Sequence, residues 1–327
     1  MTSENIIGND DNKKHATVLF PLSEDFFKEE TRCGYTVSAK MKRIWAKELD
    51  LLRTFADVCE KNDLEYFLDG GTLLGAIRHK GFIPWDDDVD VIMPRKDYDR
   101  LWEIADACFE YPYFFQTSLS EKNFFRAHAQ LRNSETTGFI RSDEKKDINK
   151  GIFLDIFPLD NVPSDKIERE QLKNKTAKYK RILSFAYDRD PDELNFPKRC
   201  ANTLLRAVIS PQKKFVKFNR LLSMYKDAET DEVGDISLDW RESVIWDKEL
   251  YDGFCYMQFE NLSLRAPSGY DKIMTKQYGD YMKLPDDINA KNGRSHGGVT
   301  FEPDMPYKEY FRMINAEQTD KTNNEQE

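Results

Sequence analysis

The stretch from Leu68 to Pro94 constrains this chain more than any other part of its sequence. Within it, acidic and aliphatic residues alternate from Asp88 to Met93, which is a β-strand pattern. Because successive side chains of a strand point to opposite faces, Asp88 and Asp90 share one face while the valines between and after them face the core. The sequence therefore predicts a strand that presents two carboxylates at one site.

Two carboxylates in this arrangement favour a divalent metal. Residues two apart lie roughly 6.5 to 7 Å apart along a strand, so the pair can converge on one cation or bracket two. Without a cation they repel, and hard oxygen ligands suit Mg²⁺ or Mn²⁺. An EF-hand is disfavoured, since counting from Asp86 the sixth residue is Val91 and the twelfth is Asp97. A solvated acidic loop remains the alternative, with Asp86 and Asp87 as loop or supporting residues.

A third carboxylate stands at Asp155, within the apolar run from Gly151 to Phe157 that has the composition of a strand. If that strand neighbours the first, the three aspartates complete a metal cluster suited to phosphoryl transfer. The alternative is an aspartate that is solvated at a strand end or caps a helix. We place Asp160 in that second class.

The glycines and the basic triplet of the same stretch suggest an anion site. Gly70, Gly71 and Thr72 open a short predicted helix, capped by Thr72, and free amides at a helix start bind anions. The triplet Arg78-His79-Lys80 follows; it either reaches phosphate oxygens or is a solvated helix end. Two weaker candidates lie elsewhere, namely Arg132 in an aromatic strand and His296 in a glycine-rich loop.

The flanking sequence predicts a mixed α/β fold. Apolar residues recur at three- and four-residue steps from Val37 to about Asn62, which predicts an amphipathic helix. A lysine-rich helix is predicted from Ser164 to about Asp188, and one or two more between Pro197 and Lys226. The remaining elements expected are strands at 64–68, 113–117, 124–132, 136–141 and 151–157 and helices at 97–109 and 270–278.

Composition limits the classes of partner. The formal net charge is −10, which argues against nonspecific binding to nucleic acid or anionic lipid. The five cysteines form no CxxC pair, and no run approaches the roughly 20 apolar residues of a membrane helix. No signal peptide is visible. We expect a soluble cytoplasmic protein, whose association with the inner face of the membrane would be peripheral, through a lipid-linked acceptor.

The run from Gly71 to Asp90, GTLLGAIRHKGFIPWDDDVD, closely resembles the signature of the LicD family, which includes bacterial phosphocholine transferases and is related to the fukutin group. Residues 151–160 resemble the family's second motif. Residues 278–285 resemble its C-terminal block, with His296 and Pro306-Tyr307 beyond. The resemblance covers roughly residues 40 to 312. Thr72 stands where nucleotidyltransferases often carry serine.

This resemblance implies an α+β, nucleotidyltransferase-like fold, a mixed sheet flanked by helices with a helical insertion and a loop-rich C-terminal region. It assigns Asp88, Asp90 and Asp155 to Mg²⁺ or Mn²⁺ and to catalysis. The donor phosphates would contact Gly70, Gly71, Thr72, Arg78, His79, Lys80, Arg132 and His296. The domains expected are an N-terminal arm (1–35), a catalytic core (36–162), the insertion (163–235), a C-terminal part (236–314) and a disordered tail (315–327).

The reaction implied is transfer of a phospho-alcohol, such as phosphocholine from CDP-choline, onto a hydroxyl of a cell-surface glycan: lipopolysaccharide, teichoic acid or capsule. Asp155 or Asp88 would help to remove the hydroxyl proton, and an aromatic cage would hold choline. Two alternatives stay open. One is a glycosyltransferase that uses a nucleotide sugar, and the other is a non-catalytic, metal-stabilised module in glycan assembly.

Overall fold

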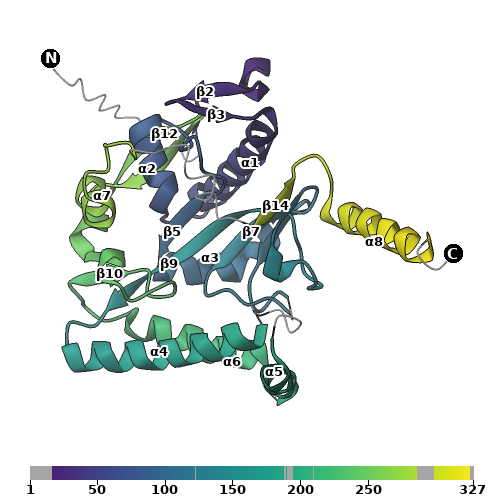
Figure 1. The fold of residues 1–327 in the computed structure, drawn as a ribbon. Coiled ribbons are helices and arrows are strands. Elements are labelled where there is room, and N and C mark those ends of the chain that lie inside the picture. Colours follow the sequence, from purple (N-terminus) through teal and green to yellow (C-terminus); the bar gives the residue numbers. More distant parts are fainter. Residues whose placement is uncertain are drawn as a thin grey trace.

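The computed structural model describes residues 17–121, 123–187, 189, 194–208, 210–285 and 298–324 (Figure 1). The fold is α+β, as predicted. Its helices are α1 (Ala39–Lys61), α2 (Gly70–His79), α3 (Arg95–Cys108), α4 (Lys166–Tyr187), α5 (Phe196–Val208), α6 (Pro211–Leu222), α7 (Tyr270–Tyr278) and α8 (Tyr307–Asn324). None of these has the length and apolar character that a membrane crossing requires.

The strands form one large mixed sheet and three small sheets. The large sheet has the order β11-β10-β9-β5-β4, and β7 joins β9 on the side of β10 and carries β6. The smaller sheets are β1-β13-β12, β14-β8 and β2-β3. The strand bounds are β1 (Thr17–Val18), β2 (Glu30–Arg32), β3 (Tyr35–Val37), β4 (Phe67–Leu68), β5 (Asp90–Pro94), β6 (Tyr113–Gln116), β7 (Ala129–Asn133), β8 (Thr137–Ile140), β9 (Ile152–Val162), β10 (Glu232–Gly234), β11 (Ile245–Asp247), β12 (Phe254–Phe259), β13 (Leu262–Pro267) and β14 (Val299–Glu302).

Strand β9 organises the large sheet. Its eleven residues pair in parallel with β5 on one side and antiparallel with β7 and then β10 on the other. Its burial is nearly continuous, as expected for a central strand with both faces covered. The register sets Asp155 opposite Asp90 of β5 and opposite Gln130 of β7. The strand with Asp155 is therefore a neighbour of the strand with Asp90, which is the condition that the predicted cluster of three aspartates required.

Helix α1 packs against this sheet, within one residue or two of its predicted bounds. The Ser38 hydroxyl accepts a hydrogen bond from the Met41 amide and so caps the helix start. The predicted apolar stripe is buried, with Trp45 and Phe55 fully enclosed. Glu48 is an acidic residue on this mostly apolar buried face, and it lies next to the acidic loop described below.

Between β9 and β10, helices α4, α5 and α6 form a layer with its own small core. Leu183, Phe215 and Phe218 are among its buried residues, and α4 packs along α6. Figure 1 shows this layer along the lower edge of the molecule, with α5 at its end. The lysine-rich helix predicted from Ser164 to about Asp188 is α4.

Three local expectations differ from the structure. The strand predicted from Asp88 begins at Asp90, and the one predicted from Phe124 begins at Ala129. The tail predicted to be disordered (315–327) is helical up to Asn324, where α8 ends. Figure 1 shows α8 extending away from the body. Its first turns contact the body through the rings of Tyr310, edge-on to Phe139, and Phe311, tilted against Phe139.

Candidate active site

The candidate site is a cavity of about 650 Å³ where the start of α2, the loop before β5 and the strands β5, β9 and β7 meet. Its polar lining includes Asp69, Gly70, Gly71, Arg78, Asp86, Asp87, Asp88, Asp90, His128, Gln130, Arg132, Asp155 and Asp235. Its aromatic lining is Trp85, Phe153, Phe157, Tyr278, Tyr281 and Phe301. With Asp143 and Asp280, which also line it, nine carboxylates share this cavity.

Asp90 and Asp155 face each other across the parallel strands β5 and β9. Burial, followed by the charges of Asp88 and Asp155, raises the pKa of Asp90 well above its usual range. Burial also acts to raise the pKa of Asp155, but His128 and Gln130 outweigh it, and that pKa is lowered. Two carboxylates in such proximity repel unless a cation or a proton lies between them.

Asp155 is held by two side chains of the neighbouring β7 region. Its Oδ1 accepts a hydrogen bond of 2.6 Å from Gln130 Nε2 and lies 3.1 Å from His128 Nε2. Gln130 is itself fixed, because its Oε1 accepts a bond of 2.6 Å from Arg132 Nη2. These two contacts orient the carboxylate of Asp155, which lines the cavity.

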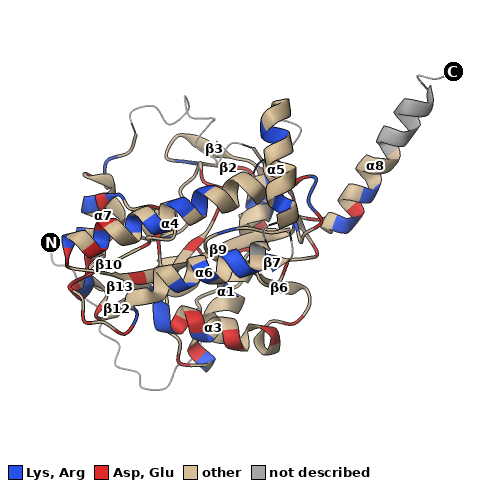
Figure 2. Ribbon diagram, turned by 90° about the horizontal axis from the view of Figure 1, so that it is seen from below, with Lys and Arg blue, Asp and Glu red and all other residues tan. Residues whose placement is uncertain are grey.

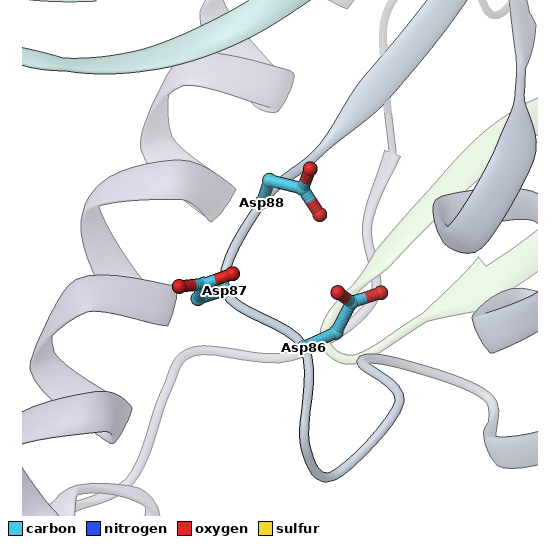
Figure 3. A group of neighbouring side chains, drawn as sticks. All are labelled: Asp86, Asp87 and Asp88. Atoms are coloured by element: carbon cyan, nitrogen blue, oxygen red, sulfur yellow. The ribbon is translucent and has the colours of Figure 1, made fainter. Parts of the chain in front are cut away.

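The loop before β5 gathers three further carboxylates. One oxygen each of Asp86, Asp87 and Asp88 lies within 4.8 Å of the others. Figure 3 shows Asp86 and Asp88 directed to the same side of the loop and Asp87 toward the neighbouring helix, which is α1. Asp88 is therefore a loop residue and does not share a strand with Asp90. Asp86, which the alternation pattern assigned to the loop alone, lies in the same group of carboxylates as Asp88.

Glu48 of α1 adds to this concentration of acids. Its side chain is buried, and burial together with the charges of Asp88, Asp87 and Asp86 raises its pKa well above the usual range. Within the described residues, its Oε2 has no hydrogen-bond partner. The acidic loop accordingly packs on a carboxyl group that favours its neutral form.

The two glycines at the start of α2 make room for these aspartates. Gly70 has a left-handed backbone (φ +50°), and a Cβ there would lie 3.4 Å from Asp90 Oδ2. At Gly71 a Cβ would meet Asp86 Oδ2 at 2.7 Å. Asp69, not Thr72, is the residue that precedes the helix; the Thr72 hydroxyl instead accepts a 2.8 Å bond from the Asp90 amide. The start of α2 is thereby fixed to the start of β5.

The basic triplet does not act as one unit. Arg78 lines the cavity, where its Nη1 donates a 3.0 Å bond to the Tyr281 carbonyl and its Nε a 2.8 Å bond to His79 Nε2. His79 does not line the cavity; burial, followed by Arg78, lowers its pKa to about 4. Lys80 ends α2 in a left-handed conformation. Of the three, Arg78 alone lines the cavity that holds the aspartates.

Arg132 lines the cavity and is linked to Asp155 through Gln130. It is buried, and its guanidinium donates to Gln116, to Gln130 and to the carbonyls of Gly138 and Gly151. Burial lowers its pKa to about 10. His296 lies outside the described residues.

Several residues that line the cavity were not predicted from the sequence as site residues. His128 and Gln130 alternate with Arg132 along the chain, and this spacing was a usable signal. Asp69 and Asp235 are buried; burial, followed by Asp235, raises the pKa of Asp69 to about 7, and burial raises that of Asp235 to about 6. No local pattern indicated Asp235, because it follows β10 and reaches the cavity through the pairing of β10 with β9.

Comparison with known proteins identifies the family of this chain. Residues 63–189 match the model of the LicD/FKTN/FKRP nucleotidyltransferase domain. The chain is 30% identical over 273 residues to the lipopolysaccharide cholinephosphotransferase LicD of Haemophilus influenzae, covering 77% of this chain and 96% of that protein. It is 39% identical over 91 residues to human ribitol 5-phosphate transferase FKRP, covering 24% of this chain and 18% of that one.

These matches define the class as a transferase with a nucleotidyltransferase domain. The chain belongs to the LicD family and is a phosphotransferase of the LicD type. The segment matched to FKRP supports the predicted link with the fukutin group.

Proposed function

We propose that this protein transfers phosphocholine from CDP-choline onto a hydroxyl of a cell-surface glycan, with Mg²⁺ or Mn²⁺ at the acidic cluster. The observation that carries the proposal is the register that sets Asp90 against Asp155 inside a cavity, next to the acidic loop. The relative from Haemophilus influenzae, which this chain covers almost completely, is named for phosphocholine transfer to lipopolysaccharide. We propose a glycan of that kind as the acceptor, in preference to teichoic acid or capsule.

The residues fit a hard divalent cation. Carboxylate oxygens are its preferred ligands, and the raised pKa of Asp90 indicates that this site favours positive charge. Asp88, Asp90 and Asp155 would hold the ion, with Asp86 beside them. Bound there, the metal would neutralise charge on the donor diphosphate and on the departing nucleotide.

The protein side chains then have separate tasks. Gln130 and Arg132 keep the Asp155 carboxylate oriented. Arg78, which lines the cavity, is the side chain of the basic triplet that can approach the donor phosphates. Asp88, a loop residue that lines the cavity, would accept the proton of the attacking hydroxyl.

The aromatic lining suits a quaternary ammonium group. Trp85, Tyr278 and Tyr281 line the same cavity as the aspartates, and aromatic faces attract such a cation. Burial and the charges of Asp69 and Asp90 raise the pKa of Tyr278, so its ring stays neutral and faces negative charge. Both properties favour choline over an uncharged alcohol.

The test is release of CMP from CDP-choline in the presence of Mg²⁺ or Mn²⁺ and a glycan acceptor. We expect release to require both metal and acceptor and to be lost in Asp90→Asn, while Asp106→Asn, an exposed change on α3, remains active. Release of a nucleoside diphosphate from a nucleotide sugar instead would make the protein a glycosyltransferase. Unchanged activity in excess chelator would refute the metal.

A further inference from the structure

Helix α5 turns its apolar side away from the protein. Phe196, Cys200, Leu204 and Val208 recur at four-residue steps and therefore share one face. Phe196, Leu204 and Val208 are 79%, 65% and 70% exposed, and Cys200 is exposed as well. A helix of a soluble domain usually shows the opposite arrangement.

The side of α5 that faces the protein is mostly polar, apart from Leu205, which is partly buried against the core of the layer. Asn202 is the buried residue of this helix, and its Nδ2 donates a 2.6 Å bond to the Phe185 carbonyl at the end of α4. Arg206 donates through Nε to the Ala186 carbonyl. Hydrogen bonds to α4 thus orient the helix and leave its apolar stripe outward.

The layer that carries α5 is strongly basic. Helices α4, α5 and α6 together contain fourteen Lys and Arg against two Asp and Glu, a formal net charge of +12 in a chain of −10. Figure 2 looks onto α4 and α6 and shows Lys and Arg distributed along both. Lys198 and Arg199 lie on α5 itself, beside the apolar stripe.

We propose that this surface docks the enzyme on an anionic lipid bilayer, with the apolar stripe of α5 inserted at the interface and the basic residues of α4, α5 and α6 against the headgroups. An apolar helical face flanked by basic residues is the arrangement that binds such interfaces. A second copy of this chain would bring the same +12 surface against itself, which like-charge repulsion opposes. Bare polyanions would satisfy the charge but leave Phe196, Leu204 and Val208 in water.

This inference reverses the expectation drawn from overall charge. A net charge of −10 argued against anionic lipid, but screening at physiological salt limits each charge to about 8 Å. A membrane therefore experiences the charge of the face turned toward it. The acids that dominate the total lie elsewhere in the chain.

The layer is also connected to the active-site cavity. Lys180 of α4 donates to the carbonyls of Ser237 and Leu238 in the segment after β10, and Leu238 lines the cavity. Docking through this layer would therefore orient the cavity relative to the bilayer and to any acceptor carried on a lipid. The docking itself does not depend on which group the enzyme transfers.

The test is sedimentation with vesicles of phosphatidylglycerol and phosphatidylcholine in equal parts, compared with vesicles of phosphatidylcholine alone. We expect at least about tenfold stronger binding to the anionic vesicles, lost at high salt. Replacing Phe196, Leu204 and Val208 together by serine should weaken it about tenfold or more. The matched control replaces the exposed Tyr111, Leu119 and Met313 by serine and should bind as the unmodified protein does.

A second readout reports insertion directly. An environment-sensitive fluorophore on Cys200, in a Cys33→Ser background, should shift to the blue with anionic vesicles only. Equal binding to both vesicles, no effect of the serine variant, or binding to heparin without binding to vesicles would each overturn the proposal. CMP release with a soluble acceptor should be unchanged in the serine variant, so this test and that of the transfer reaction fail independently.

Discussion

The sheet around Asp90 and Asp155 and the helical layer α4–α6 use charge in opposite ways. The sheet region concentrates acids in a cavity and on the buried face of α1 beside it, where burial and repulsion raise the pKa of Asp90, Asp69 and Glu48. The layer spreads basic residues over an outer surface, where solvent screens them. Like charges in a cavity raise carboxyl pKa values and favour a bound cation. Like charges on an outer surface determine which charged surfaces the protein binds. The two regions should therefore respond differently to substitution.

The largest expected effect follows from removing a carboxylate of the sheet pair. Asp155→Asn keeps the shape of the side chain but weakens its hold on a cation, so we expect CMP release to fall at least about a thousandfold, about 4 kcal/mol in activation free energy. Steady-state rates at saturating Mn²⁺ would measure this. Circular dichroism should show an unchanged fold. Activity within a few-fold of the unmodified enzyme would remove Asp155 from the mechanism.

Asp235 should make the stability of the metal-free protein depend on pH. Its folded-state pKa of about 6 lies above its ordinary value of 3.8, so the folded state holds the proton more tightly than the unfolded chain does. The stability it contributes is present below about pH 4 and is lost as pH rises through about 6, up to about 3 kcal/mol.

Urea unfolding across this pH range, with a chelator present, should therefore show a flatter profile for Asp235→Asn than for the unmodified protein. The exposed change Asp106→Asn should leave the slope as it is. Parallel profiles for Asp235→Asn and the unmodified protein would mean that the side chain is not enclosed as described.

The orientation of Asp155 by Gln130 predicts an intermediate effect. Gln130→Leu removes the 2.6 Å bond to Asp155 and the acceptor of Arg132. We expect the Mn²⁺ concentration for half-maximal activity to rise about 10- to 100-fold, with a smaller change in the maximal rate. Metal titrations of activity would separate the two quantities. An unchanged metal requirement would assign Gln130 a purely structural role.

The smallest effect is expected in the helical layer. Lys173→Gln together with Lys178→Gln alters two exposed residues of α4. Unfolding free energy should change by less than about 0.5 kcal/mol, and turnover on a soluble acceptor by less than about twofold. Urea unfolding and CMP release would measure them. A large loss in either would show that this layer contributes to the fold or to the catalytic step, and the contrast between the regions would fail.

The sequence predicted the parts of this fold that local patterns specify. The stripe of α1, the strand with Asp155 and the α+β class depend on periodicity and composition, and each is present. The helix start at Asp69 and the position of Asp88 before the strand differ by only one to three residues, which local signals do not resolve.

Other features depend on tertiary contacts that no local pattern contains. Asp235 enters the cavity because β10 pairs with β9, and Arg132 is fixed by carbonyls of Gly138 and Gly151. The lysine-rich composition of α4 was visible in the sequence, but its place in one basic layer with α5 and α6 depends on tertiary packing, and the net charge of the chain does not record it.

The central claim, that the cluster holds a divalent metal against the donor diphosphate, is tested most directly by Mn²⁺ binding. Electron paramagnetic resonance measures free Mn²⁺, and ³¹P relaxation of CDP-choline reports its distance from bound metal. We predict that the unmodified protein depletes free Mn²⁺ and accelerates relaxation of both phosphates, and that Asp90→Asn with Asp155→Asn does neither. Equal Mn²⁺ binding by the two proteins would contradict the account.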